Sequence, residues 1–380
     1  MDASRPFGLS RRALLAATAA LAACGRRNDP TRVTMWAMST EGENAPLLMP
    51  AFTRATGIGV DLQSLPWTAA HEKMLTAYAG DTLPDLVMVS NAWVPEFAAI
   101  GAITPVPPAL MADQFHGITT QVRVGPHHYG LPWMVGAHVQ FFLRAPVEAA
   151  GHAAPPADWA GWKAMAHRIK ARAPDNWPVL MMLNWPEHLL SFAVQLGAPL
   201  LREGDRFGNF RSPEFRTALG FYKSLFDEGL APRLLSTEIE DPLTAFARGT
   251  FALYPGQPYM VGDLDRRPKE IRRDQWATAP MPGPHGPAAG LIGGNSLAVT
   301  RDARDPARAW ALARYLCAPA TQVRFHAYTG DLPSRPSAWA TLTDPASATF
   351  RDQMSRPGLQ PAQDLQGIDR GVHAQPGHGA

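Results

Sequence analysis

The sequence of 380 residues has no long run of lysine and arginine, and its charges nearly cancel, with 35 Lys+Arg against 33 Asp+Glu. This balance gives no indication of a nucleic-acid-binding face. The 32 glycines and 37 prolines are scattered without a period, which excludes a collagen-like or low-complexity chain. The only two cysteines are Cys24 and Cys317, so a disulfide framework and a cysteine zinc cluster are both excluded.

The composition instead indicates a folded protein with a sizeable core. Hydrophobic residues make up 46% of the chain and charged residues 18%, which excludes wholesale disorder. The length predicts two or three domains or lobes. The eleven tryptophans are a high count, and they can either fill the core or form an aromatic platform for a ligand.

Residues 1–24 are typical of an export signal. Arg5, Arg11 and Arg12 form a basic start, and residues 13–23 are an uncharged apolar run that is too short to span a membrane. Residues 10–15 (SRRALL) resemble a twin-arginine signal. We therefore expect export from the cytoplasm to the periplasmic or cell-surface side of the membrane, with the twin-arginine pathway as a candidate route.

The end of this segment, residues 21–24 (LAAC), resembles a bacterial lipobox, whose cysteine becomes the lipidated first residue of the mature protein. The sequence thus predicts a lipid anchor on Cys24 and a polar tether at residues 25–31. The alternative is a plain secretory signal with an incidental cysteine. Cys317 lies in an apolar helical pattern, so we expect a buried, inert thiol.

The hydrophobic pattern of the rest of the chain changes twice, from alternating strands and helices to mainly helical and back again. Strand-like runs at 32–37, 59–64 and 85–89 alternate with helical patterns at 43–56 and 69–78, which predicts a parallel α/β sheet. After a strand at 139–143 the pattern is mainly helical, at 158–173, 187–196, 213–227 and 242–248, with strands at 179–183 and 250–254. A strand at 295–300 and helices at 307–316 and 321–328 follow.

This order is explained by a discontinuous first lobe with a second lobe inserted in it. The predicted first lobe comprises residues 32–136 and 291–331, and the second lobe comprises 137–290 and 332–355. From residue 356 the chain is polar, aperiodic and rich in Pro, Gly, Gln and His, so we expect a disordered tail at 356–380.

Five segments, in this order and spacing, resemble the family 1 extracellular solute-binding proteins of ABC importers, the maltose-binding-protein-like group. They are residues 83–97 (LPDLVMV to WVPEF), 129–133 (YGLPW), 158–162 (DWAGW), 281–299 (MPGP to GGNSLAV) and 309–335 (AW to TGDLPSR). The likeness runs from about residue 32 to 352. The family normally continues with further helices, so the second lobe is expected to be incomplete.

The resemblance implies an α/β, two-lobed periplasmic-binding-protein-like fold (type II) whose hinged lobes close on a ligand in a cleft. It also implies a monomer that is not an enzyme, needs no cofactor or metal, and delivers a carbohydrate to membrane permease subunits with a cytoplasmic ATPase. A sugar offers apolar faces to aromatic rings and hydroxyls to Asp, Glu, Asn, Gln and Arg.

Candidate ligand contacts follow predicted strands or lie at the crossovers between lobes, where open α/β sheets bind ligands. They are Trp36, Ser39, Thr40, Glu41, Trp67, Asn91, Trp93, Trp133, Asn184, Trp185, Gln257, Tyr259, Gly293, Gly294, Asn295 and Arg335. Alternatives remain open for several of them: a helix cap formed by Ser39 or Thr40 with Glu43, hinge packing for Trp133, a tight turn for the glycines, and a surface position for Arg335.

Two other classes of function compete with a sugar-binding protein. One is an exported carbohydrate-active hydrolase, since residues 294–298 (GNSLA) nearly match the nucleophile elbow and carboxylate pairs such as Asp263 and Asp265 suit glycoside chemistry. Solvated surfaces are the alternative for such pairs. The other is a binder of glycerol phosphate or a polyamine, which would need clustered charges. Because the candidates show few clustered charges, the sequence favours a neutral di- or oligosaccharide.

Overall fold

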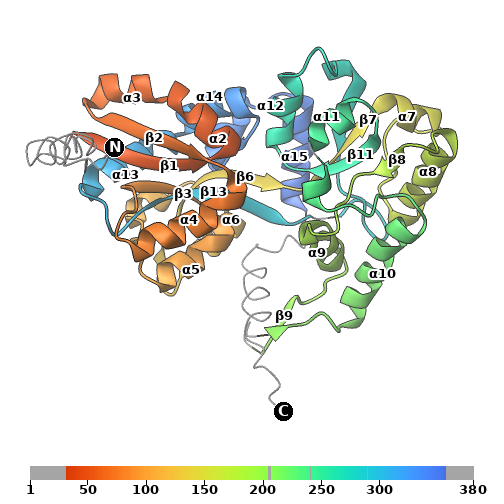
Figure 1. Cartoon of the computed structure of the whole chain (residues 1–380), viewed down its shortest axis with the longest axis horizontal. Helices are drawn as coiled ribbons and strands as arrows, with labels where there is room; N and C mark the ends of the chain where they lie inside the picture. The colour runs from red at the N-terminus through yellow and green to blue at the C-terminus, as the bar shows by residue number, and fades with distance from the viewer. Residues whose placement is uncertain (1–30, 204–206, 240, 289, 357–380) are drawn as a thin grey trace, which may run out of the picture.

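The computed structural model describes residues 31–203, 207–239, 241–288 and 290–356. The predicted signal, the Cys24 lipobox, nearly all of the tether and the tail beyond residue 356 lie outside these residues. The described chain forms two α/β lobes side by side, each built around its own sheet (Figure 1). The two-lobed α/β architecture predicted from the sequence is therefore present.

The first lobe contains a six-stranded sheet in the order β14-β6-β13-β3-β1-β2. β1 pairs in parallel with β2 and β3, whereas β13 runs antiparallel to both β3 and β6. The strands are β1 (Arg32–Met38), β2 (Gly59–Leu65), β3 (Leu86–Ser90), β6 (Leu131–Ala137), β13 (Ile292–Val299) and β14 (Leu332–Pro333). Parallel pairing places the carboxyl ends of β1, β2 and β3 at one edge.

Helices on this sheet include α2 (Ser39–Asn44), α3 (Met49–Thr56), α4 (Trp67–Ala79), α5 (Val94–Ala99), α6 (His116–Gln121), α13 (Pro306–Leu316) and α14 (Pro319–Thr329). The single helix predicted at 43–56 is in fact broken into α2, a 3-10 turn (Ala45–Leu47) and α3. Pro46 and Pro50 lie at the starts of the turn and of α3, where their missing N–H groups are tolerated. Cys317 is buried, as predicted.

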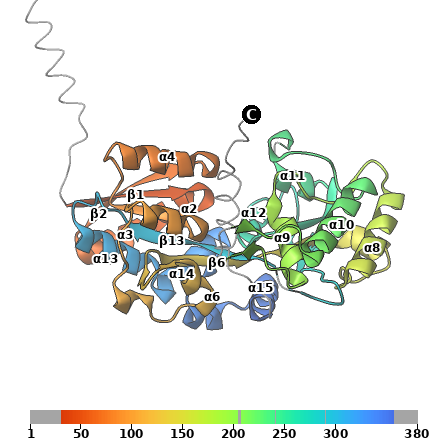
Figure 2. The same ribbon diagram turned by 90° about the horizontal axis from the view of Figure 1, so that it is seen from below.

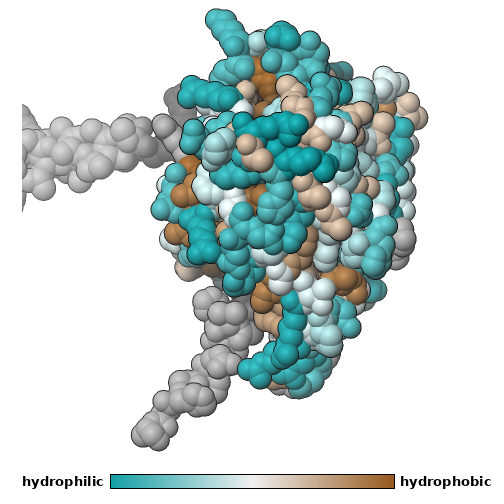
Figure 3. All heavy atoms as spheres, turned by 90° about the vertical axis from the view of Figure 1, so that its right-hand side faces the viewer, coloured by the Kyte–Doolittle hydropathy of each residue, from teal (hydrophilic) through white to brown (hydrophobic). Residues whose placement is uncertain are grey.

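The second lobe contains a four-stranded sheet in the order β12-β7-β11-β8. Its strands are β7 (Val139–Leu143), β8 (Trp177–Val179), β11 (Phe251–Gly256) and β12 (Trp276–Ala279). Its helices include α7 (Arg144–Ala149), α8 (Trp159–Arg172), α9 (Pro186–Gln195), α10 (Pro213–Asp227), α11 (Pro242–Ala247), α12 (Tyr259–Asp265) and α15 (Pro345–Ser355). The end face of this lobe is mostly hydrophilic, with only scattered hydrophobic residues (Figure 3).

The chain passes between the lobes at a few defined points. His138 alone separates β6 of the first sheet from β7 of the second, and residues 280–291 lead from β12 back to β13. β6 and β13 pair with each other and extend together toward the second lobe (Figure 2). Two short hairpins complete the described strands: β4 (Arg123–Val124) with β5 (His127–His128), and β9 (Leu201–Arg202) with β10 (Phe207–Gly208).

Candidate functional site between the lobes

Glu41 lies in the first turn of α2, at the carboxyl edge of the first sheet. The helix sits so close to this edge that a Cβ on Gly42 would lie 2.6 Å from Ser64 Oγ. Ser39, the first residue of α2, has a φ of 41°, which is uncommon for a residue with a Cβ. The N-cap is Met38, with no side-chain hydrogen bond, so the capping arrangement considered for Ser39 is not formed.

Three separate segments bring carboxyl groups to the junction of the lobes. Glu41 comes from the first lobe, Asp331 from the turn after α14, and Asp263 from α12 of the second lobe. Asn295 of β13 donates from Nδ2 to Glu41 Oε1 at 3.2 Å. Tyr259, the first residue of α12, lies within electrostatic reach of all three carboxyls, and burial, the largest effect, raises its pKa. Glu41, Tyr259 and Asn295 were predicted site residues, and the structure brings them together.

The two inner carboxyl groups are strongly perturbed. Glu41 and Asp331 are each only 8% exposed. Burial raises the pKa of Glu41 well above its ordinary value, and the nearby charge of Asp331 raises it further. Burial likewise raises the pKa of Asp331, with the charge of Asp263 adding to the effect. Asp331 Oδ2 is buried without a hydrogen-bond partner, so the junction holds acceptor capacity that the protein leaves unused.

The cationic side chains near Glu41 and Asp331 form their own bonds with other groups. Arg266 forms an ion pair with Asp263 and also donates to the carbonyl oxygen of Tyr328. A ring nitrogen of His326 lies 2.9 Å from the backbone oxygen of Asp331, not from its carboxylate. Within the described part of the chain, no ion pair joins a cationic side chain to Glu41 or Asp331.

An aromatic platform stands at the same edge of the first sheet. Trp67 begins α4 directly after β2, and Trp93 ends the 3-10 turn (Asn91–Trp93) that follows β3. Their rings stack with centroids 5.2 Å apart at an interplanar angle of 28°, and Trp67 is 40% exposed. Trp36 lies within β1, not after it as predicted, and the ammonium group of Lys73 lies 4.6 Å from its ring. The stack offers an open ring face of the kind that an apolar ligand surface needs.

Three other predicted residues have polar groups already bonded within the protein. Asn91 is buried, donates to Gln121 Oε1 at 3.1 Å and accepts from Ser296 Oγ at 2.6 Å. Asn184 is exposed and makes two hydrogen bonds of 2.8 Å with Ser236. The guanidinium of Arg335 donates to backbone carbonyls of the first lobe, those of Leu110, Ala112 and Cys317.

Trp133 and the two glycines serve the interior of the first lobe. Trp133 is buried and stacks on Phe325 with centroids 4.8 Å apart. A Cβ on Gly294 would lie 2.3 Å from the Met134 carbonyl oxygen, whereas Gly293 has nothing within 4 Å of that position. The close approach that requires glycine at 294 is therefore made by β6.

Trp185 and Gln257 lie on the second lobe, at either end of a row with two buried histidines between them. Trp185 is half-buried, with its ring 6.2 Å from that of His188. The rings of His188 and His138 are 5.7 Å apart, and Gln257 Nε2 lies 3.2 Å from the ring nitrogens of His138. Burial lowers the pKa of His138 to about 3 and that of His188 to about 4, so both rings are neutral near pH 7.

Of the features that suggested a hydrolase, Ser296 serves the interior of the first sheet, and the Asp263–Asp265 pair is divided between the junction and the surface. Ser296 is buried in β13, and its hydroxyl donates to Asn91, so it is not an exposed nucleophile on a strand-to-helix turn. Asp265 is exposed, 3.7 Å from Arg273. No group of three potential ligands suited to a metal ion occurs among the described residues. A search of the same residues finds no helix with the length and hydrophobicity needed to cross a bilayer.

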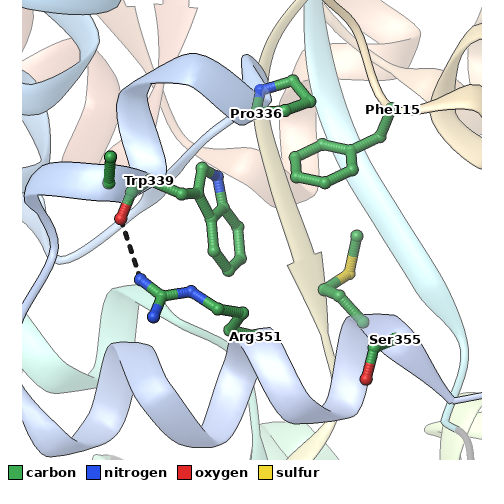
Figure 4. Close-up of a pocket in the computed structure, with 7 residues that line it drawn as sticks. Phe115, Pro336, Trp339, Arg351 and Ser355 are labelled. Carbon is green, nitrogen blue, oxygen red and sulfur yellow. Dashed lines mark hydrogen bonds between the residues drawn. The ribbon is translucent and has the colours of Figure 1, made fainter.

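A separate pocket of about 360 Å³ lies between the start of α6, the turn Pro336–Thr341 and α15. Phe115 and Trp339 meet edge to face across it, with centroids 5.4 Å apart (Figure 4). Arg351 lines it but donates to the carbonyl oxygens of Trp339 and Leu342 at 2.8 and 3.0 Å. This lining is mostly apolar and offers few hydrogen-bond partners to a polyhydroxylated ligand.

The prediction from sequence missed Asp331 and misplaced Asp263. Asp331 was visible only as part of the TGDLPSR segment, and Asp263 as one of a pair expected on a solvated surface. What brings both residues to the site is the packing of α12 against the end of α14. The two helices approach so closely that a Cβ on Gly262 would lie 2.4 Å from the Thr329 carbonyl oxygen. That contact joins segments from different lobes, so no local pattern reveals it.

Comparison of the chain with known proteins identifies its family. Residues 48–350 match the family model described as bacterial extracellular solute-binding protein. The solved structure of the sugar-binding protein MalE from Xanthomonas citri is 36% identical, with 88% of this chain and 90% of that chain covered and a TM-score of 0.77.

Two curated relatives agree with this assignment. A protein of Brucella abortus named as a binding protein is 25% identical over 288 residues, which is 73% of this chain and 69% of the relative. One of Deinococcus radiodurans, named as an ABC transporter-binding protein, is 23% identical, with 72% and 68% covered. The chain belongs to the bacterial extracellular solute-binding proteins, the binding components of ABC transporters.

Proposed function

We propose that this protein captures a carbohydrate between its two lobes and delivers it to the permease of an ABC importer, whose ATPase subunits supply the energy. The observation that carries the proposal is the junction itself. Glu41 accepts a hydrogen bond from Asn295 there and lies within electrostatic reach of Tyr259, at the same sheet edge as the stacked rings of Trp67 and Trp93. Hydroxyl-bonding groups beside an open aromatic face are what a sugar requires.

The similarity to the X. citri protein supports a sugar as the ligand, since that protein is named as sugar-binding and shares most of its length with this chain. A di- or oligosaccharide is the proposed size. Contact by the other predicted residues, including Trp36, Trp185 and Gln257, is part of the proposal. So are the lobe boundaries, a monomeric state, and export with lipid anchoring through Cys24.

A ligand screen with a tryptophan variant tests the proposal. The purified protein is melted with mono-, di- and oligosaccharides, and with glycerol phosphate and polyamines. A ligand at about 100 times its Kd adds ~2.7 kcal/mol of stability, a readable shift in Tm. Trp67→Ala is expected to weaken sugar binding about tenfold in calorimetry, ~1.4 kcal/mol, because an open stacking face is lost.

The matched control is Trp177→Ala, since Trp177 is half-buried on the second lobe and stacks under Lys170. This variant should bind the sugar with unchanged affinity. A Trp67→Ala protein that also binds normally would remove the platform from the site. If no sugar shifts the melt while glycerol phosphate does, or if the protein cleaves a saccharide, the proposed function is wrong.

A further inference from the structure

The charges at the junction are unbalanced. Glu41, Asp263 and Asp331 lie within electrostatic reach of one another. Among the described residues, the one ion pair to any of them joins Arg266 to Asp263, while Arg266 and His326 act on Asp331 only through their nearby charge. Glu41 and Asp331 are more than nine-tenths buried, where an unpaired carboxylate is costly. A wholly neutral sugar would form hydroxyl hydrogen bonds with them but would bring no cation to favour their ionised form.

The unused bonding capacity of Asp331 points in the same direction. Its Oδ2 is buried without a partner, and an unsatisfied buried acceptor costs about 1–3 kcal/mol, more when it is charged. Glu41 has a neutral donor, Asn295, at 3.2 Å. The site therefore lacks one strong donor between the two inner carboxyls.

A bound metal ion does not fit this need. Metal cages require oxygen ligands within about 2.0–2.6 Å of the ion, and the described residues contain no group of three carboxylates or histidines arranged to hold one. An ammonium group reaches farther, because its three N–H donors bond carboxylates at N···O distances of about 2.7–2.9 Å. An ammonium group can thus bond two carboxyl groups that are not arranged to ligate a metal ion.

We propose that the ligand of this junction carries an ammonium group, which lies between Glu41 and Asp331 while another part of the ligand covers the Trp67–Trp93 stack. This inference rests on the proposed function and names the chemical class of its ligand. An amine-bearing saccharide fits both features, since its ring faces meet the tryptophans and its cation meets the acids. A free polyamine shares the ammonium chemistry but has no ring face.

Matched ligands separate these sources. Calorimetry of the purified protein compares two sets of saccharides. The first set is cellobiose, its di-amino counterpart chitosan dimer and the neutral di-N-acetyl form of that dimer, and the second is maltotetraose with the amine-bearing acarbose. Spermidine is the polyamine without a sugar ring. In at least one set the amine-bearing member is expected to bind about tenfold tighter or better than the hydroxyl member. Measured in two buffers of different ionisation enthalpy, its binding should release protons, because the ammonium group ionises the inner carboxyls.

Charge-removing variants locate the effect. Glu41→Gln and Asp331→Asn should each remove most of the preference for the amine, while hydroxyl-only members keep their affinity within about threefold. Asp265→Asn is the matched control, since Asp265 is at the exposed end of α12 beside Arg273 and should leave the preference intact. Tm of each variant confirms that it folds.

The outcomes distinguish the two proposals. If neutral sugars bind as well as or better than their amine counterparts, the ammonium inference is overturned and the proposed function stands. Tighter binding of spermidine than of every saccharide would keep the ammonium site but contradict a carbohydrate ligand. Binding of none of these probes would overturn both.

Discussion

At the scale of single residues, the site depends on how deeply a few carboxyl groups are buried. Sequence reasoning identified Glu41, Tyr259 and Asn295 because each lies in or after a strand at the expected edge. It missed Asp331 because an aspartate in a turn is ordinarily solvated. What changes its chemistry is the packing of α12 from the other lobe, which depends on residues about 70 positions away.

Asp331 should make the stability of the free protein depend on pH. Burial raises its pKa to about 7, so its contribution to stability is fully present below the ordinary pKa of an aspartate and is lost as pH rises through about 7. Urea unfolding from pH 4 to 8 should show the free energy of unfolding of the native protein falling by at least ~1 kcal/mol relative to Asp331→Asn. Parallel pH profiles for the two proteins would contradict this expectation.

At the scale of elements, the sequence predicted most helices and strands to within a few residues, but not β6. The segment around YGLPWMVGA carries Gly and Pro, which locally argue against a strand. β6 exists because β13 and β14 pair with it on either side, and such long-range pairing is absent from a local pattern. The register between β6 and β13 shifts near Asn295 and Ser296, an irregularity that a local pattern does not show either.

Two adjacent glycines of β13 test this pairing. Gly294→Ala should lower the free energy of unfolding by about 1–3 kcal/mol, because the new Cβ would meet the backbone carbonyl of Met134 at 2.3 Å. Gly293→Ala, in the same strand, meets nothing within 4 Å and should change stability by less than about 1 kcal/mol. Equal losses for both, in urea titrations, would show that β6 does not constrain position 294.

At the scale of the whole molecule, the two lobes touch backbone to backbone. Gly262 of α12 lies against Thr329 and Gly330 at the end of α14, beside the candidate site (Figure 1). The resemblance of the ordered segments to solute-binding proteins was enough to predict two lobes. It could not predict this contact, which depends on the absence of side chains at two positions far apart in the chain.

A methyl group at position 262 should act as a wedge between the lobes. Gly262→Ala places a Cβ 2.4 Å from the Thr329 carbonyl oxygen, so closure around a ligand should be impaired and sugar affinity should fall about tenfold. Small-angle scattering with saturating sugar should give a larger radius of gyration than for the native protein. Gly220→Ala in α10, where a Cβ meets nothing within 4 Å, is the control, and equal affinities would contradict the wedge.

The pairing of β6 with β13 also limits how the lobes can move. The two strands stay joined as far as Ala137 and Ile292, and just beyond them Gly290 packs against the backbone of His138. Bending at these two neighbouring crossings is thereby restrained, and the chain crosses between the lobes a third time between β14 and α15. We expect the lobes to open and close about these crossings as a hinge, so that each closure returns Tyr259 and Asp263 of the second lobe to the same place beside Glu41 and the aromatic platform.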